Sequence, residues 1–527
     1  VHSSPMIDQM KRDEIQARFQ RAGIESMCEE YSTTFVDDEF LPSQQSVGEL
    51  HQDRGSAIPG KLHSSELVWL RPTVMNREYE SDFEWTVFND PNSCDIIQGY
   101  LGDCWLMSAL AMVAERPDVL EKIFLTKVYS KIGLYQVRLC VDGVWRVITV
   151  DDFFPCRQSS RSFAFAYGRN KQLWVPLVEK AFAKALGKYE RLRTGTVIEG
   201  FALLTGAPCE SISLEDDDLD KDLLWATLKS ASEAGFIMGA SCGAGGKQRI
   251  ATETSQSHGL RTRHAYSVLD VRQEGCHRLI RLRNPWGRRV WIGDWSDNWS
   301  GWPADLKRRL LPPGEHSPGA FWMPYADFLL HFYRLELAKL RDHLNWAELR
   351  VPCKIGGSWT NEAVALMLII EEPTEMCCSL FREGSRSDSE HDDLFISVHR
   401  LSPQGQVGEL EMRSSRNLKH MVSTGDFFIR PGHYIILPMS ISSVNRGSVP
   451  LNGSLVVHSN KQLFGETVKC PPQMATDALV QLTLKEGEEH QIYDGVVART
   501  LSKQFGGLLV MVDNFSDSHA ILTTDCT

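Results

Sequence analysis

The sequence predicts a mixed α+β chain, with a region of helices and strands first and an all-β region after it. An apolar run over residues 105–114, stopped by Pro117, is long enough for about three helical turns. Strand patterns at 135–139 and 145–150 flank an Asp-Gly turn. From about residue 346 the pattern becomes short alternating strands separated by turns, which is typical of a β-sandwich.

With 527 residues, the chain is long enough for roughly three or four domains. Changes of pattern divide it into a helical lead-in, two halves of a mixed region, a β-sandwich and a further β-rich unit: residues 1–30, 31–210, 211–342, 343–460 and 461–527. Residues 478–484 and 508–512 of the last unit predict strands, although its length is short for a second sandwich.

Two more helices are predicted in the mixed region. The lead-in holds a polar helix over 13–30 that is expected to dock on the edge of the domain, and a core helix runs from about 173 to 186. Four apolar residues of the lead-in helix recur roughly on one face: Ile15, Phe19, Ile24 and Met27.

Composition restricts the class of protein and its partners. The net charge of −12 argues against a nucleic-acid partner, and no basic patch supports membrane binding. The 13 cysteines are scattered without metal-type clusters, which favours a reducing, cytoplasmic location and predicts no zinc in this chain. The chain begins with Val1 and has no run suited to a signal peptide or membrane span, so we expect a fragment of a longer protein. The oligomeric state stays open.

Cys104 is the first candidate for chemistry, because it lies where a glycine-containing loop meets the predicted helix at 105–114. The backbone N–H groups and dipole of a helix start favour a thiolate, the nucleophilic form of cysteine. Gln98 lies six residues earlier and carries an amide donor suited to an oxyanion. A buried structural cysteine is the alternative that this feature alone leaves open.

A histidine and an asparagine downstream favour a catalytic cysteine over a structural one. His264 begins a predicted strand, and Asn284 follows a second strand after a short turn. Two antiparallel strands would bring these residues side by side. A cysteine followed about 160 residues later by histidine and then asparagine is the order of papain-like proteases, in which the gap is about 130–150 residues.

The residues around these positions closely resemble the calpain family of cysteine proteases. Three blocks carry the resemblance: Gln-Gly-x-Leu-Gly-Asp-Cys-Trp at 98–105, His-Ala-Tyr-Ser-Val at 264–268 and Arg-Asn-Pro-Trp-Gly at 283–287. The residues at 114–117 and 261–264 resemble most those of the small-optic-lobes branch of the family. The resemblance implies a papain-like two-lobed cysteine protease core followed by a calpain-type β-sandwich.

The resemblance also implies roles for individual residues. Cys104, His264 and Asn284 match the catalytic triad, and Gln98 matches the oxyanion donor. Around the cleft, Gly195 matches a glycine that lines the substrate strand, and Trp286 matches a tryptophan that moves on activation. Arg263 stands where calpains usually have glycine. Two expectations stay open: that this long cation narrows the cleft or favours acidic substrates, and that it points away and pairs with a surface carboxylate.

Calcium is where the chain departs from the family, whose cores bind two ions. In the first half, Phe88 and Asp90 match carbonyl ligands, Asp95 matches the aspartate, and Gln172 replaces the glutamate. Loss of that charge weakens a site, since affinity follows ligand charge count. In the second half only Asp297 is retained; the other ligand positions fall on Val290, Pro318 and Ala320. We therefore expect at most one weak core calcium site.

The leading hypothesis is an intracellular calpain-type endopeptidase that hydrolyses internal bonds of protein substrates and depends only weakly on calcium. A calpain-like scaffold that cleaves slowly or never is the alternative, favoured by Arg263 and the eroded calcium positions. Acyl transfer of the transglutaminase kind also uses cysteine and histidine, but Asn284 argues against it because that chemistry normally has aspartate third.

Overall fold

The computed structural model describes residues 2, 4–50, 62–75, 83–193, 195–243, 252–285, 287, 290–312, 318–341, 346–356, 363–384, 392–418, 420–441, 450–503, 505–517 and 519. Contacts divide the chain into two compact units. The mixed unit comprises Met10–Val141 and Trp145–Leu340, and the β unit comprises Val1–Gln9, Asp142–Val144 and Arg341–Thr527. Across the described residues, no helix combines the length and apolar character needed to cross a bilayer.

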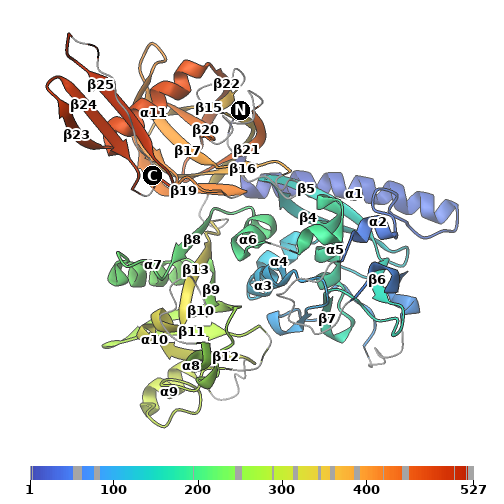
Figure 1. Ribbon diagram of the computed structural model, residues 1–527. Helices are drawn as coiled ribbons and strands as arrows, with labels where there is room; N and C mark the ends of the chain where they lie inside the picture. Colours follow the sequence, from blue (N-terminus) through green and yellow to red (C-terminus); the bar gives the residue numbers. More distant parts are fainter. Residues whose placement is uncertain are drawn as a thin grey trace. The chain divides into compact units, whose positions relative to one another are not determined.

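The first part of the mixed unit, here called the helical half, is built mainly of helices (Figure 1). Its helices are α1 (Met6–Glu30), α2 (Gln44–Val47), α3 (Cys104–Val113), α4 (Pro117–Ile123), α5 (Trp174–Leu186) and α6 (Val197–Thr205), with short 3₁₀ turns at Ser64–Glu66, Pro72–Val74, Ser93–Asp95, Arg169–Lys171 and Tyr189–Leu192. Its strands form two-stranded pairs: β2 (Leu67–Leu70) with β6 (Phe154–Arg157), β3 (Ile96–Ile97) with β7 (Tyr167–Gly168), and β4 (Leu134–Val141) with β5 (Val144–Asp151). The predicted strands at 135–139 and 145–150 and the core helix at 173–186 are confirmed.

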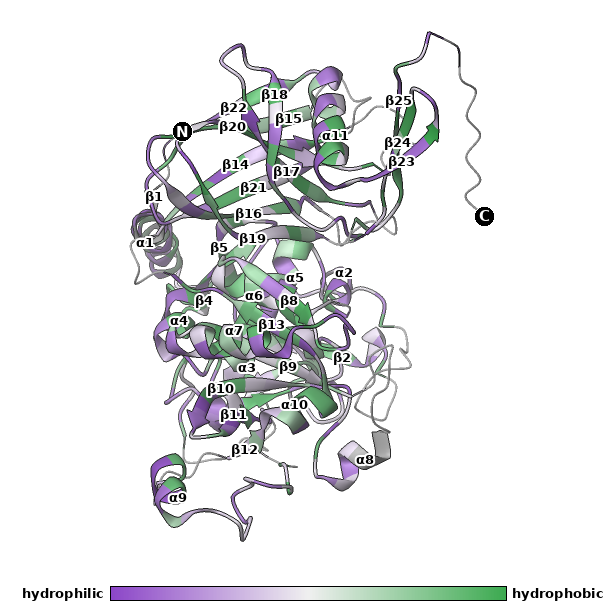
Figure 2. Ribbon diagram, turned by 90° about the vertical axis from the view of Figure 1, so that its left-hand side faces the viewer, coloured by the Kyte–Doolittle hydropathy of each residue, from purple (hydrophilic) through white to green (hydrophobic). Residues whose placement is uncertain are grey.

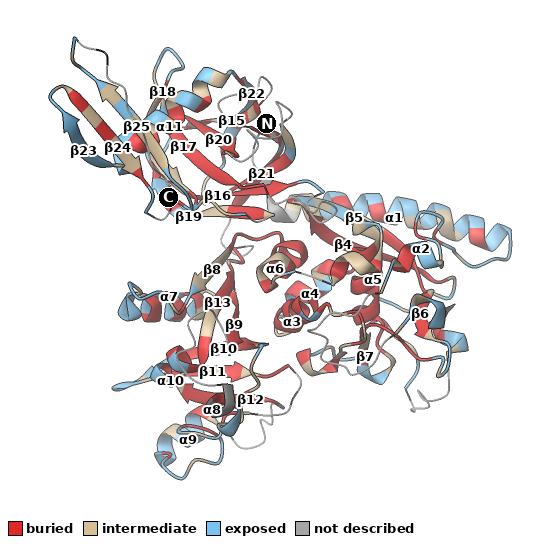
Figure 3. Ribbon diagram, in the orientation of Figure 1, coloured by how far each residue is buried: buried red, intermediate tan, exposed pale blue. Residues whose placement is uncertain are grey.

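Helix α1 docks by a different face from the one predicted. Phe19 is 77% exposed, and Ile15 and Met27 are exposed as well. Figure 3 shows that much of α1 is exposed. The buried side holds Asp13 and Ala17, and Asp13 Oδ2 accepts a hydrogen bond from Arg138 Nε of β4 at 2.7 Å. A paired buried carboxylate therefore sets the docking face, although polar residues normally lie outside.

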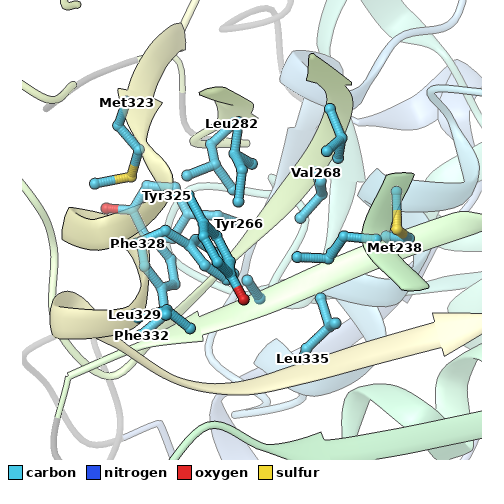
Figure 4. Packing of buried hydrophobic residues seen from close by; sticks show 14 of the residues in the cluster. Met238, Tyr266, Val268, Leu282, Met323, Tyr325, Phe328, Leu329, Phe332 and Leu335 are labelled. Carbon is cyan, nitrogen blue, oxygen red and sulfur yellow. The ribbon is translucent and has the colours of Figure 1, made fainter. Parts of the chain in front are cut away.

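The second part of the mixed unit, here called the sheet half, is a six-stranded antiparallel sheet in the order β12-β11-β10-β9-β13-β8. Its strands are β8 (Cys209–Ser213), β9 (Ile237–Cys242), β10 (His264–Glu274), β11 (His277–Arg283), β12 (Ala320–Pro324) and β13 (Phe332–Ala338), and its helices are α7 (Lys221–Glu233), α8 (Thr252–Ser257), α9 (Ala304–Leu310) and α10 (Tyr325–His331). Figure 4 shows the buried core of this half, in which Phe328 of α10 and Tyr266 of β10 lie close together.

Two glycines let α3 approach its neighbours closely. A Cβ on Gly200 of α6 would lie 2.4 Å from Ala109 Cβ of α3, and a Cβ on Gly239 of β9 would lie 2.4 Å from Met112 Sδ of α3. Real Cβ atoms do not approach that closely, so a larger residue at 200 would push α6 away from α3, and one at 239 would force the Met112 side chain to move. Helix α3 is thereby held against α6 of its own half and β9 of the sheet half.

The β unit is a ten-stranded antiparallel assembly with the order β18-β17-β20-β15-β14-β21-β16-β19, to which β1 is added on β14 and β22 on β15. The strands are β1 (Ser4–Pro5), β14 (Ala347–Ile355), β15 (Ala363–Ile370), β16 (Thr374–Arg382), β17 (Phe395–Leu401), β18 (Val407–Arg413), β19 (Met421–Ile429), β20 (Gly432–Met439), β21 (Leu451–Ser459) and β22 (Phe464–Cys470). One buried apolar cluster contains residues from strands at both ends of this order, as the packing of two sheets in a sandwich requires. Figure 2 shows apolar residues along these strands.

The predicted organisation of residues 461–527 is partly wrong. Strand β22 pairs with β15, so the sandwich continues past residue 460. Residues 478–484, predicted as a strand, lie in helix α11 (Pro472–Glu486), which has proline at its first position and buries Ala478 and Leu482. A three-stranded sheet follows, made of β23 (Glu488–Tyr493), β24 (Val496–Leu501) and β25 (Leu509–Asn514).

Candidate active site

The loop before α3 is shaped by two glycines. A Cβ on Gly99 would lie 2.3 Å from backbone atoms of Phe165, so the loop can pass there only with glycine. The next residue, Tyr100, donates its N–H to the Ala164 carbonyl at 2.9 Å. Gly102 has a φ of +82°, which suits glycine and turns the chain into the helix. Gln98, half-buried, directly follows β3 at the start of this loop.

Cys104 is the first residue of α3 and is exposed as a residue. The expectation that the helix start favours a thiolate is not met here. Partial burial of the thiol raises its pKa above the ordinary value, and the neighbouring Asp103 raises it further. Backbone hydrogen bonds at the helix start act in the opposite direction but are weaker. Cys104 is therefore a neutral thiol in this arrangement.

A buried carboxyl pair behind Cys104 was missed from the sequence. Asp103 is fully buried, and burial raises its pKa to about 6; its carboxyl interacts with Glu179 of α5, which is also buried. Burial and the Asp103 charge raise the pKa of Glu179 well above its ordinary value. Two such carboxyls cannot both ionise readily, so burial and the neighbouring Asp103 favour the protonated form of Glu179. A glutamate within the apolar face of the helix at 173–186 was the available signal.

His264 and Asn284 are brought together by strand pairing. Strands β10 and β11 pair antiparallel, with Ser267 opposite Arg283, so the start of β10 lies beside the end of β11. His264 Nε2 and Asn284 Oδ1 are 3.0 Å apart, and an amide oxygen accepts, so the ring nitrogen donates. Asn284 is buried, and its backbone N–H donates to the Gly319 carbonyl at 2.9 Å. The asparagine therefore fixes the orientation of the imidazole.

The imidazole is neutral at physiological pH in this structure. Burial lowers the pKa of His264 to about 4; the Asn284 hydrogen bond raises it and the Arg261 charge lowers it, both by less. Helix α3 contacts β9 and β10, but among the described residues no hydrogen bond joins Cys104 to His264. The structure therefore unites two of the three predicted residues and leaves the sulfur uncoupled from the ring.

The predicted cleft residues have different outcomes. Gly195 is exposed and lies just before α6. Trp286 lies outside the described residues. Arg263 is exposed and has a φ of 53°, a left-handed conformation that side chains other than glycine rarely adopt. Arg263 therefore holds, under strain, a backbone conformation that glycine would adopt freely.

Replacing Arg263 with glycine is expected to stabilise the mixed unit by about 1 kcal/mol. Relief of strain contributes about 1–2 kcal/mol, and the greater freedom of glycine in the unfolded chain removes roughly 0.5–1 kcal/mol of it. Arg263→Ala is the matched control, because it removes the charge and keeps the Cβ. Thermal unfolding followed by circular dichroism checks this; equal midpoints for both variants would contradict it.

The residues that the resemblance assigns to calcium lie together but bond to one another. Gln172 Oε1 accepts from the Asn89 N–H at 2.9 Å, so its Nε2 faces Asp95 and donates to Oδ2 at 2.9 Å. The Phe88 carbonyl accepts from the Thr86 hydroxyl. Calcium needs oxygen ligands, and an amide donor directed at Asp95, the carboxylate assigned as a side-chain ligand, does not suit it. As arranged, these residues do not fit calcium.

Two of the second-half positions have surroundings that do not suit a metal ion. Val290 is apolar, and the Pro318 carbonyl lies 3.6 Å from Cys94 Sγ, which donates to it. Throughout the described ranges, no three His, Cys, Asp or Glu side chains gather as a metal would require.

Comparison with known proteins settles the family. Residues 35–339, more than half of the chain, match the family model described as "Calpain family cysteine protease". The chain belongs to the calpain family of cysteine proteases. Residues 482–527 match a second model, described as "Calpain-D-like, C-terminal domain". The α+β core followed by a β-rich region agrees with this assignment.

Curated calpains align with part of this chain. Calpain-type cysteine protease DEK1 of Arabidopsis thaliana is 36% identical over 313 residues, which are 58% of this chain and 14% of that protein. The calpain-2 catalytic subunit of Gallus gallus is 30% identical over 357 residues, which are 64% of this chain and 48% of that protein. The chain thus spans less than half of the length of each. A solved clostridial cysteine protease, Cwp84, aligns at 9% identity and a TM-score of 0.16, over 47% of this chain and 58% of that chain, which supports no argument.

Proposed function

We propose that this calpain is a cysteine endopeptidase that hydrolyses internal peptide bonds of protein substrates through a thioester acyl-enzyme. The hydrogen bond between Asn284 and His264, which begins a strand that lies against the helix starting with Cys104, is the observation that carries the proposal. Because Nε2 is engaged by Asn284, Nδ1 is the ring nitrogen that takes the proton of Cys104.

The proposed reaction has two steps. The Cys104 sulfur attacks the substrate carbonyl, and its proton passes to His264 and then to the leaving amine. Water next hydrolyses the thioester, with His264 accepting a proton from that water. The Gln98 amide and the Cys104 backbone N–H stabilise each oxyanion, at roughly 2.7–4 kcal/mol per donor in enzymes with similar sites. Gly195, which has no side chain, lets the substrate backbone approach.

The uncharged state of Cys104 and His264 implies a closing step. A thiolate–imidazolium pair forms only when sulfur and ring come within hydrogen-bonding distance, since each charge then stabilises the other. We propose that substrate binding supplies this closure. The same observation favours the alternative function, a calpain-like scaffold that binds proteins without cleaving them.

Product analysis tests the proposal against both alternatives. The chain is incubated with a denatured protein and a primary amine, and the products are analysed by mass spectrometry. Endopeptidase activity predicts fragments with new carboxyl termini at internal bonds. Amine incorporation without such fragments would indicate acyl transfer of the transglutaminase kind, and an intact substrate retained in a complex would indicate a scaffold.

We propose that calcium binding by the core is weak, at one site at most. The hydrogen bond from Gln172 Nε2 to Asp95 Oδ2 supports this, because it links the two side chains directly. With glutamate at position 172, a metal ion would lie between two carboxylates instead. Any calcium dependence of the whole protein then has its origin in other segments or in weak binding here.

Gln172→Glu is expected to create calcium dependence. Two adjacent carboxylates repel each other without a cation and bind one more tightly, because affinity follows ligand charge. Calcium at 100 times its dissociation constant should then stabilise the variant by about 2.7 kcal/mol. Calorimetric titration and thermal unfolding with and without calcium measure this. Gln172→Ala, which adds no ligand, is the control; two tight sites in the unmodified chain would contradict the proposal.

We further propose membership of the small-optic-lobes branch and a reducing, cytoplasmic location. The residues at 114–117 and 261–264 support the assignment to this branch. The 12 described cysteines are all free thiols, which supports a reducing compartment. Protein substrates remain the expected partners.

A further inference from the structure

An ion pair joins the end of the nucleophile helix to the strand that carries Asn284. Glu115 follows α3 after a single residue, and its Oε2 pairs with Nη1 of Arg283, the last residue of β11. The same Nη1 donates to Ser93 Oγ at 3.1 Å. Both partners are largely buried, with side-chain exposures of 18% for Glu115 and 16% for Arg283. A buried pair of this kind is strongly directional.

A second contact crosses between the halves from the next residue. Arg116 Nη1 donates to the carbonyl of Gly235, just after α7 of the sheet half, at 2.5 Å. Asp118 holds the guanidinium, accepting from Nε and Nη2 at 2.9 Å each. Gly235 has a φ of +70°, a left-handed conformation that favours glycine at this contact. Glu115 and Arg116 thus attach the end of α3 to two parts of the sheet half.

We propose that Glu115 and Arg283 are positioning residues that hold α3 against the sheet half, so that the closing step brings Cys104 to His264 and Asn284 in the productive register. The proposal rests on the endopeptidase function proposed above. Arg283 is adjacent to Asn284, and Glu115 lies at the other end of α3 from Cys104. Ten helical residues span about 15 Å, so a rotation of roughly 4° about the pair displaces Cys104 by about 1 Å relative to the sheet half.

Such a displacement acts on catalysis rather than on binding. A misplacement of about 1 Å can cost about 100-fold in rate, because reacting groups must meet in an aligned geometry. Loss of the pair is therefore expected to lower kcat and to leave KM nearly unchanged. A merely structural pair would lower stability without this separation of kcat from KM.

Glu115→Gln in the full chain tests the proposal. We expect kcat to fall about 10- to 100-fold with KM changed less than about two-fold. Hydrogen exchange followed by mass spectrometry should show faster exchange in peptides covering both 104–116 and 277–285. Asp13→Asn is the matched control, because it breaks another buried pair, Asp13–Arg138, that lies within the helical half. It should lower the unfolding temperature and leave kcat unchanged.

The outcomes separate this inference from the proposed function. A folded Glu115→Gln variant with unchanged kcat and unchanged exchange would overturn the inference. If that variant does not fold, Arg283→Lys keeps the charge but lacks the fork-shaped guanidinium, and full activity of this variant would overturn it equally. If the unmodified chain hydrolyses nothing, the endopeptidase function fails, and faster exchange at both segments in Glu115→Gln still shows the link between the halves.

Discussion

Replacing Cys104 with alanine is expected to lower the rate of peptide hydrolysis by about 10⁴- to 10⁶-fold, because no other group can form the thioester. Loss of a nucleophile costs about as much as loss of the whole triad, since its members act together. The variant should bind substrate with nearly unchanged affinity, because the oxyanion donors and the cleft remain. Hydrolysis of a quenched fluorescent peptide, followed to completion over days, provides the required range.

Cys276→Ala is the matched control for this experiment. Cys276 is also an exposed thiol of the mixed unit, but it lies in the turn between β10 and β11, at the opposite end of β10 from His264. It should keep full activity and full thermal stability. If Cys104→Ala retained activity within ten-fold of the unmodified chain, another nucleophile would have to be found.

The alkylation rate of Cys104 in the substrate-free chain is expected to rise steeply with pH. Thiolate is the reactive form, and the pKa of Cys104 lies above its ordinary value, so the thiolate fraction grows about ten-fold per pH unit from pH 6 to about 8.5. His264, with a pKa of about 4, is neutral over that range and supplies no imidazolium to stabilise a thiolate. Iodoacetamide labelling with peptide mapping measures this rate.

His264→Ala distinguishes the two possible resting states. If the sulfur and the ring are uncoupled, the variant has the same pH profile of Cys104 labelling as the unmodified chain. A preformed thiolate–imidazolium pair would instead give a rate that is nearly flat from about pH 4 to 8 and that falls in the variant. The flat profile would contradict the closing step proposed here.

Local patterns predicted much of the fold. The apolar run at 105–114 and the strands around the Asp142-Gly143 turn depend on residues close together in the chain. So does the antiparallel pair β10 and β11, from which the neighbourhood of His264 and Asn284 was predicted. The spacing of apolar residues and the residue types found in turns are enough to predict such features.

Choices that depend on distant partners could not be predicted. Helix α1 offers two faces at helical spacing, and the buried one is chosen by Arg138, more than a hundred residues away. The alternation of Val480 and Leu482 also suits a strand, but Pro472 and the packed Ala475, Ala478 and Leu482 favour α11. Tertiary packing decided both cases.

The candidate active site shows the same difference between what local patterns predict and what depends on distant residues. Residue types and order predicted the catalytic candidates, whereas protonation and hydrogen-bond direction depend on burial. Asp103 and Glu179 become a coupled pair only because α5 packs behind the loop before Cys104. The direction of the Gln172 amide is set by the Asn89 N–H, which no pattern of side chains reveals.

Covalent labelling with a peptidyl epoxide tests the central claim most directly. Unlike iodoacetamide, the reagent occupies the substrate cleft as a peptide does, so it brings about the proposed closing step and alkylates a cysteine that the neighbouring histidine then activates. We predict a single adduct on Cys104, lost in His264→Ala and unaffected in Cys276→Ala. Labelling of Cys94 or Cys276 at the same rate as Cys104, or an equal Cys104 adduct in His264→Ala, would contradict the account.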